Sequence, residues 1–331
     1  MNEQIKTRED LERILNGRRL VVSVSGGKDS TACCLHLMEL GYEPHEYDRI
    51  FFDTGWEHPY LYDYIREDLP NIVGPVDTLR AEVEIPEELE ETAREFEREL
   101  GVEYSSMVRL VLRKGTFPSR VRRFCTESLK VSPAKQYLRG VAGGVVNVVG
   151  IRAEESSARA MMTEWEFAPA FDCDTWRPLI DWPVEKVIAI HQRHGVKPCR
   201  LYLEQNADRV GCYPCIYSRK AEIRSMGMHS PERVDLIERL ELVVKGLAEK
   251  RCAAKGETLE TIGAGDPGWF QTPRRTKRDD GSTTGEPWPI REVVKWSRTS
   301  RGGHVDQLEL FTDPVGHQGC VRWGMCDTGS E

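Results

Sequence analysis

Six consecutive residues of this 331-residue chain have the types and spacing needed to hold a phosphate group, namely Ser25-Gly26-Gly27-Lys28-Asp29-Ser30. The two glycines allow a tight turn that brings backbone N–H groups close to a phosphate oxygen. Lys28 adds a full positive charge, the serine hydroxyls donate hydrogen bonds, and a following helix adds the partial charge of its N-terminus. The segment is not the Walker loop, which requires Gly-x-x-x-x-Gly-Lys-Ser/Thr. We interpret it as a phosphate-binding loop rather than a plain glycine turn.

The elements that must position this loop alternate between strands and helices. Apolar runs predict strands over residues 19–24, 47–53, 75–80 and 145–151. Helical patterns cover residues 7–16, 29–40, 58–69 (closed by Pro70), 84–100 and 184–194. This alternation predicts a doubly wound α/β fold with a mainly parallel sheet, and in such sheets ligands bind at the C-terminal ends of the strands. Three segments fall at such ends: 25–30, 53–57 and 151–159.

The amino-acid composition of the chain changes after about residue 250. Residues 255–304 are rich in Gly, Thr, Pro and Arg and contain few apolar runs. We therefore divide the chain into a nucleotide-binding domain, residues 1–245, and an irregular C-terminal extension, residues 246–331. Cys320 and Cys326, on either side of Trp323, suggest that the end of this extension folds back onto the body.

The chain has ten cysteines, which in a cytosolic protein suggests metal or redox chemistry more than disulfides. Cys212-Tyr-Pro-Cys215 can supply two thiolates to a zinc ion or to an iron–sulfur cluster, or can form a redox-active dithiol. One such pair is only half of a metal site. The adjacent Cys33 and Cys34 have apolar helical neighbours and are predicted to be buried core thiols. Cys173 and Cys252 are expected to be structural or incidental.

The composition of the chain argues against two classes of protein, those that coat nucleic acid and those that span a membrane. The formal net charge is −8, which argues against a protein that coats nucleic acid over its whole surface. No apolar run is long enough to span a bilayer, and the N-terminus lacks a secretory pattern, so a cytoplasmic protein without a membrane association is expected. Two local basic clusters remain open to either an anion-binding role or ordinary solvation. These are Arg274–Arg278 and the set Arg109, Arg113, Lys114, Arg120, Arg122, Arg123 and Lys130.

The phosphate loop resembles the PP-loop of ATP pyrophosphatases. Later segments, in the same order, resemble the phosphoadenosine-phosphosulfate-reductase-like branch of that superfamily. They are Phe52–Glu57, Arg123–Pro133, Gly150–Ser156 with Arg159, Arg177–Leu179 with Asp181-Trp182, and Arg209–Cys215. Within this branch the motifs are most similar to the DndC-like sulfurtransferases of DNA phosphorothioation. The resemblance covers about residues 18 to 225, and each later motif is specific only in combination with the others.

The resemblance implies an adenine nucleotide alpha hydrolase-like fold that binds ATP with Mg²⁺ and releases pyrophosphate. The implied catalytic residues are Lys28, Asp29, Lys130 and Arg152. The implied ATP-binding residues are Ser23, Ser25, Gly26, Gly27, Lys28, Asp29, Ser30, Asp53, Thr54, Gly150, Arg152 and Glu155. For Asp53 the competing interpretation is a turn-forming residue, and for Arg152 a surface salt bridge.

The resemblance also implies a 4Fe–4S cluster. Its ligands would be Cys125, Cys212 and Cys215, with Cys326 as the fourth ligand and Cys320 or Cys199 as alternatives to Cys326. Zinc remains the competing metal. A cysteine desulfurase or another sulfur donor would be a partner, and an oligomer is possible.

Three functions remain open from the sequence. The first is an ATP-dependent sulfurtransferase that adenylates an acceptor, such as DNA in phosphorothioation or tRNA in thiolation, and inserts sulfur. The second is a reductase of phosphoadenylyl or adenylyl sulfate, with Cys320 or Cys326 as nucleophile. The complete phosphate loop argues against the reductase, as does a tail that lacks the Glu-Cys-Gly-Leu/Ile-His motif of those reductases. The third is a non-catalytic nucleotide-binding subunit of a larger complex.

Overall fold

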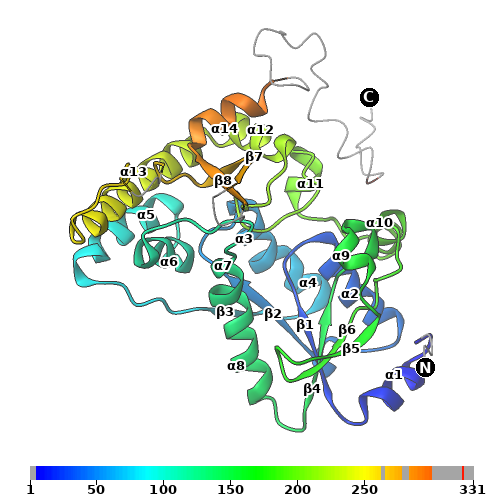
Figure 1. Cartoon of the computed structure of the whole chain (residues 1–331). Coiled ribbons are helices and arrows are strands. Elements are labelled where there is room, and N and C mark those ends of the chain that lie inside the picture. The colour runs from blue at the N-terminus through cyan, green and yellow to red at the C-terminus, as the bar shows by residue number, and fades with distance from the viewer. Residues whose placement is uncertain (1–4, 262–264, 278–282, 300–322, 324–331) are drawn as a thin grey trace, which may run out of the picture.

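The computed structural model describes residues 5–261, 265–277, 283–299 and 323. A six-stranded sheet with its helices forms one part of the molecule, and a second group of helices with a small hairpin gathers beyond one end of the sheet (Figure 1). Within the described residues, no helix combines the length and the apolar character needed to cross a membrane.

The sheet has the strand order β3-β2-β1-β4-β6-β5. The strands are β1 (Arg19–Ser23), β2 (Tyr47–Asp53), β3 (Asp77–Arg80), β4 (Val145–Val149), β5 (Trp165–Ala168) and β6 (Cys173–Trp176). All neighbours pair in parallel except β5, which runs antiparallel to β6 at the edge. The chain leaves β1 toward β2 and β3 and then returns to β4 on the other side of β1. This reversal confirms the α/β prediction and creates a switch point between β1 and β4.

Alternate residues of β1 face two different apolar layers, as a strand buried on both faces requires. Leu20 and Val22 join the core formed with α2 (Lys28–Glu39) and α10 (Val184–Arg193), whereas Val21 joins Leu138 of α8 (Ser132–Gly140) on the opposite face. Cys33 and Cys34 of α2 are both 0% exposed, which confirms that they are core thiols. The remaining elements of this part are α1 (Arg8–Leu15), η1 (Pro44–Glu46), α7 (Phe124–Thr126), η4 (Glu127–Val131), η5 (Ala153–Glu155), α9 (Ser157–Ala160) and α11 (Arg200–Glu204).

The helix predicted to close at Pro70 continues past this residue. It consists of α3 (Pro59–Asp63), the π-helical segment η2 (Tyr64–Asp68) and α4 (Leu69–Val73). The N–H of Leu69 bonds the carbonyl of Tyr64, five residues back. A π-type turn changes the register ahead of the proline, whose ring and missing N–H would otherwise interrupt an α-helix.

A second hydrophobic core lies outside the sheet layers. It is built from η3 (Glu87–Leu89), α5 (Glu90–Leu100), α6 (Ser106–Lys114), α12 (Lys220–His229), α13 (Pro231–Ala253), α14 (Ile290–Ser297) and the hairpin of β7 (Phe270–Lys277) and β8 (Thr283–Trp288). Trp269, just before β7, stacks on Trp56 with ring centroids 4.6 Å apart. Because Trp56 follows β2, this stack joins the second core to the sheet.

The sequence predicted an irregular structure after residue 255. This prediction is wrong for the described part of that segment, which forms β7, β8 and α14. One helical turn separates Ile290 from Val293 and Val294. All three bury their side chains in the second core, against α12 and α13. Such a short apolar set is hidden in sequence by its Gly- and Pro-rich surroundings. The division at residue 245 also falls inside the continuous helix α13. Trp323 packs in the sheet core, and its carbonyl accepts a 2.8 Å bond from Gln192.

A buried carboxyl ties the hairpin and α14 to α13. Glu241 accepts bonds from the backbone N–H groups of Trp269 at 2.8 Å and Ile290 at 3.1 Å. Burial nevertheless raises the pKa of Glu241 to about 7. This carboxyl, 7% exposed, is thus protonated at a pH where an ordinary glutamate is ionised.

This raised pKa predicts a pH-dependent stability. The folded state holds its proton up to about pH 7, whereas the unfolded state loses it near the ordinary value of 4.5. The free energy of unfolding should therefore fall by about 3 kcal/mol as the pH rises through this window, and stay level above it. Glu241→Gln cannot ionise and should remove this fall. Urea unfolding, followed by tryptophan fluorescence between about pH 5 and pH 8, measures it.

Glu249→Gln, at an exposed position of the same helix, is the matched control and should keep the wild-type pH dependence. An unchanged slope in Glu241→Gln would show that Glu241 is ionised in the folded protein throughout this range.

Candidate nucleotide and thiol site

The phosphate loop lies at the switch point, between the ends of β1 and β4. Gly26 has φ +69°, which a glycine adopts without strain, and this allows the chain to turn from β1 into α2. The Ser25 N–H donates to the Ser30 hydroxyl at 3.1 Å, and that hydroxyl also donates to the Gly27 carbonyl at 3.0 Å. The serines expected to bind phosphate thus also hold the loop in its folded shape.

Three charged side chains meet at the start of α2. Asp29 accepts from Lys28 Nζ at 2.9 Å and from Arg152 Nε at 2.6 Å. Lys28 also lies 3.3 Å from the carbonyl of Asp208, and its own N–H donates to the Tyr202 hydroxyl at 3.2 Å. Arg152 also pairs with Glu154, so two carboxylates balance the two cations, and the partial positive charge of the α2 N-terminus remains to attract an anionic ligand. Arg152, 4% exposed, is not a surface salt bridge.

Gly150 lets β4 end against this loop. A Cβ at this position would lie 2.7 Å from the backbone carbon and oxygen of Asp29 and 2.8 Å from the Ser30 nitrogen. Only a residue without a side chain permits this approach, which places Arg152 beside Asp29. Glu155 accepts from the Arg152 N–H at 2.9 Å and pairs with Arg159. Ser23 lies below the loop and donates to Asn147 at 3.2 Å.

Asp53 and Thr54, at the end of β2, are engaged by protein groups. The Asp53 carboxylate, 2% exposed, accepts from Arg80 at 2.7 Å, from the Tyr62 hydroxyl at 2.8 Å and from the Gly55 N–H at 2.8 Å. The last bond is that of a turn-forming aspartate, the competing interpretation of this residue. Thr54 donates to Glu57 at 2.7 Å. A direct contact of Asp53 with a nucleotide stays a prediction.

Glu57 is a residue of the site that the sequence-based choice of candidates missed. It is 2% exposed, accepts from Thr54, the Trp56 N–H and the Tyr62 hydroxyl, and lies 3.9 Å from the Cys212 sulfur. Glu57 belongs to the Phe52–Glu57 motif, and this membership was the only sequence signal for it. The spacing of the motif does not distinguish a buried site residue from a solvated turn residue.

Three cysteines from two distant segments of the chain share the surroundings of Lys130. The negative charge of a Cys212 thiolate raises the pKa of Lys130, and Glu57, Cys215 and Cys125 act in the same direction. Burial raises the pKa of the Cys212 thiol to about 12, and it also raises that of Cys125. Cys125, Cys212 and Cys215 thus lie close enough to Lys130 for their charges to act on it, and their role as metal ligands stays a prediction.

The described residues do not form a finished metal site. Among them, no three His, Cys, Asp or Glu side chains converge closely enough to hold a metal ion. Cys199 packs in the sheet core, whereas Cys125 and Cys212 pack against the second core, so Cys199 does not join them. Cys320 and Cys326 lie outside the described residues. The described geometry thus does not by itself fit a cluster or a zinc ion.

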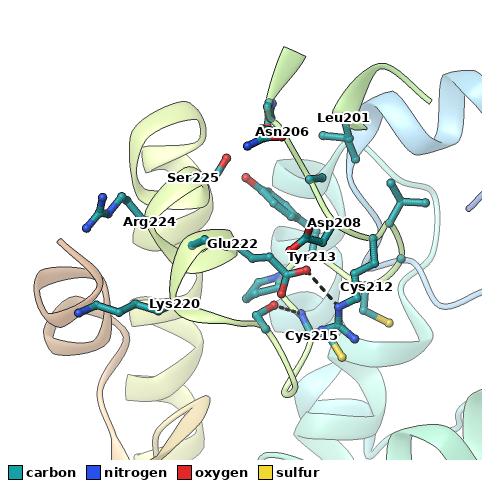
Figure 2. A pocket seen from close by; sticks show the side chains of 18 of the residues that line it. Leu201, Asn206, Asp208, Cys212, Tyr213, Cys215, Lys220, Glu222, Arg224 and Ser225 are labelled. Atoms are coloured by element: carbon teal, nitrogen blue, oxygen red, sulfur yellow. Dashed lines mark hydrogen bonds and ion pairs between the residues drawn. The ribbon is translucent and has the colours of Figure 1, made fainter. Parts of the chain in front are cut away.

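A cavity of about 570 Å³ lies beside the thiols, and no residue of the phosphate loop lines it. The segment Asp208–Val210 contributes to its wall, and the Asp208 carbonyl accepts from Lys28 Nζ at 3.3 Å. Figure 2 shows Cys212 and Cys215 on one side, opposite Glu222 and Ser225 of α12. Arg209, which also lines the cavity, pairs with Glu222 at 3.1 Å. Lys130 also lines this cavity, so its wall includes the thiols, an ammonium group and one segment that contacts the loop lysine.

The basic residues predicted around Cys125 divide into two groups. Arg109 is buried and pairs with Glu97 at 2.7 Å and Glu90 at 3.1 Å, so it is structural. Arg120, Arg122 and Arg123 are exposed. The side chains of the second cluster, Arg274–Arg278, lie outside the described residues.

Comparison with known proteins agrees with this geometry. The model of the phosphoadenosine phosphosulfate reductase domain family matches residues 19–218, and the chain belongs to this family. It is 30% identical, over 93% of its length and 96% of the relative's, to the "uncharacterized 37.8 kDa protein in gpa 5'region" of Escherichia phage 186. It is 31% identical, over 51% of its length and 69% of the relative's, to the adenosine 5'-phosphosulfate reductase of Allochromatium vinosum.

Two enzymes of known structure align with part of this chain. The phosphoadenylyl-sulfate reductase of Candida auris, in a phosphate complex, aligns with a TM-score of 0.44 and 19% identity over 64% of this chain and 90% of that one. The FMN adenylyltransferase of Candida glabrata, in complex with FAD and pyrophosphate, aligns with a TM-score of 0.40 and 12% identity. The alignment covers 60% of this chain and 56% of that one. The family assignment confirms the reductase-like branch predicted from the motifs, but does not extend to the DndC-like subgroup.

The close approach at Gly150 predicts a large effect of one methyl group. Gly150→Ala should lower the free energy of unfolding by about 1–3 kcal/mol, because the clash is with backbone atoms that cannot rotate away. It should also weaken ATP binding by displacing the loop. Urea unfolding and titration calorimetry with ATP measure the two effects. Gly246→Ala, in α13 with open space around it, is the control and should be neutral or stabilising. Equal behaviour of the two variants would contradict the close packing of β4 on the loop.

Proposed function

We propose that this protein is an ATP-dependent sulfurtransferase that adenylates an acceptor with release of pyrophosphate and then inserts sulfur. The observation that carries the proposal is the shared Asp29 carboxylate, which holds Lys28 and Arg152 at the N-terminus of α2. Reductases of this family act on a sulfonucleotide and have no need of a complete PP-loop, so a complete loop supports the use of ATP.

In the proposed reaction an oxygen of the acceptor attacks the α-phosphorus of ATP, and pyrophosphate leaves. Lys28 and Arg152, with Mg²⁺ bound to the nucleotide, would stabilise the charge that develops on the departing phosphates. A sulfur nucleophile then displaces AMP from the adenylated acceptor. Lys130 would bind the acceptor's negative charge. Gly26, Gly27 and Gly150 would supply the close backbone approach, and Ser23, Ser25, Ser30, Asp53, Thr54 and Glu155 would shape the nucleotide pocket.

The cavity beside the thiols supports this order of events. Its wall carries Cys212 and Cys215 and also Asp208, whose carbonyl lies 3.3 Å from Lys28 Nζ. An acceptor group seated there would lie beside the thiols and next to the segment that contacts the loop lysine, so it need not leave the protein between the two steps. Nucleic acid, as in DNA phosphorothioation or tRNA thiolation, is the proposed acceptor, and a cysteine desulfurase or another donor would supply the sulfur.

A reductase of adenylyl or phosphoadenylyl sulfate is the second candidate. One observation favours it, the 31% identity to the adenosine 5'-phosphosulfate reductase of Allochromatium vinosum. A sulfonucleotide could occupy the same loop, with its sulfate directed toward the thiols.

Substitution of the loop lysine distinguishes these candidates. Lys28→Gln should reduce pyrophosphate release from ATP at least about 100-fold, because it removes a positive charge from the transition state. The assay would contain ATP, Mg²⁺, hydrosulfide and single-stranded or duplex oligonucleotides, and would count pyrophosphate. Lys197→Gln, at an exposed position, is the control and should match the wild type.

A different outcome would replace the proposal. Release of sulfite from adenylyl sulfate with a dithiol reductant, without pyrophosphate from ATP, would establish the reductase. ATP binding without either product, with every acceptor tried, would support a non-catalytic nucleotide-binding subunit.

An iron–sulfur cluster on Cys125, Cys212 and Cys215 is a separate proposal, supported by their shared neighbourhood around Lys130. Protein purified without oxygen should contain iron and acid-labile sulfide and should absorb at about 400 nm. The Cys212→Ser variant should lose the iron, the sulfide and the absorption band. Cys252→Ser, at a buried cysteine of α13, is the control and should retain them. Iron-free protein that contains zinc would instead establish a zinc site, and metal-free protein would leave a dithiol.

A further inference from the structure

An exposed aromatic and basic strip borders the thiol region. The Tyr217 side chain is 39% exposed, and it follows Cys215, whose sulfur lies 3.5 Å from the Tyr217 N–H. The Arg120 guanidinium lies 5.6 Å from the centre of the Tyr217 ring, and the Tyr217 hydroxyl donates to the Arg120 carbonyl at 3.3 Å. Two segments about a hundred residues apart thus present one continuous surface.

This strip, defined as Arg120–Arg123 with Tyr217, combines three arginines with an apolar and an aromatic side chain at the surface. Arg120, Arg122 and Arg123 are all exposed, and Val121 is 77% exposed. Among the described residues, no carboxylate lies within ion-pair distance of these three guanidinium groups. Arg109, by contrast, is held by Glu90 and Glu97. In a chain of net charge −8, three such arginines in one short segment, the first of them over an exposed ring, form a local site for a polyanion.

We propose that this strip binds single-stranded nucleic acid, with a base stacked on Tyr217 and phosphates on Arg120, Arg122 and Arg123. An exposed ring flanked by arginines is the combination that single strands use, because their bases are free to stack. A duplex keeps its bases stacked inside and would contact only the arginines. The inference builds on the proposed function, since the bound strand would be the acceptor, but binding itself requires no ATP.

The position of the strip relates the strand to the cavity. Cys215 and Ser218, on either side of Tyr217 in the chain, both line the cavity. A strand stacked on Tyr217 would therefore pass the cavity wall that carries the thiols. The strip would fix the register of the strand, and the cavity would receive one of its nucleotides.

The test measures binding without ATP. A fluorescein-labelled thymidine oligonucleotide of about 12 residues is titrated with the full-length protein and followed by anisotropy, beside a hairpin duplex of the same length. Tyr217→Ala should weaken binding to the single strand by about 5- to 100-fold, the range produced by loss of one base–aromatic stack. Tyr217→Phe keeps the ring and loses the bond to Arg120, and should bind like the wild type.

The arginines are tested by their salt dependence. The double variant Arg122→Gln/Arg123→Gln should reduce the slope of log affinity against log salt by about 0.7 for each phosphate that the protein no longer neutralises. Met161→Ala and Arg139→Gln, exposed positions away from the strip, are the controls and should bind like the wild type.

Several results would overturn the inference. They are equal binding of duplex and single strand, an unchanged affinity in Tyr217→Ala, a similar loss in Tyr217→Phe, or equally effective competition by polyglutamate, which would indicate an acidic protein partner. The inference and the proposed function fail separately. Binding without pyrophosphate release would contradict only the function, and pyrophosphate release without this binding would contradict only the strip.

Discussion

The buried carboxylate of Glu57 is the group on which the arrangement of the site depends. An isolated charge inside a protein is costly unless several donors satisfy it. Glu57 receives the Thr54 N–H and hydroxyl, the Trp56 N–H and the Tyr62 hydroxyl. These donors all come from the turn after β2 and the helix that follows. The turn is therefore fixed in one shape, and the Cys212 thiol lies against the same carboxylate.

The turn that Glu57 fixes also joins the two cores. The Tyr213 N–H donates to the Trp56 carbonyl at 2.9 Å, and Arg233 of α13 donates to the Glu57 carbonyl at 3.3 Å. Trp56 in turn stacks on Trp269, at the base of the hairpin. The segment that carries the thiols is thus attached to the C-terminal end of the sheet rather than suspended from its own loop. This attachment holds the thiol segment beside the C-terminal ends of the strands, where the phosphate loop also lies.

Buried and exposed arginines of this protein differ in whether carboxylates pair with them. Two buried cations of the site region are matched by carboxylates: Arg152 by Asp29, and Arg109 by Glu97. Ions removed from water require such partners, because unpaired burial costs several kcal/mol or more. Exposed arginines need none, and it is these that remain available to an external anion. The acidic net charge therefore coexists with a basic strip beside the thiols, where a polyanion could be attracted without coating the whole surface.

The sequence alone determined the features that depend on neighbouring residues. The phosphate loop, strands β1 to β4 and their C-terminal ends follow from glycine geometry and from apolar runs, which are local properties. Tertiary structure alone decided the contacts between distant segments. These include the place of β4 beside β1, the approach of Gly150 to Asp29, the burial of Arg109, and the engagement of Asp53 by Arg80. The helix α14 was missed because its three apolar residues signal burial only once α12 and α13 are there to cover them. Strand order and packing are set by which distant surfaces fit together, and no local period in the chain records that fit.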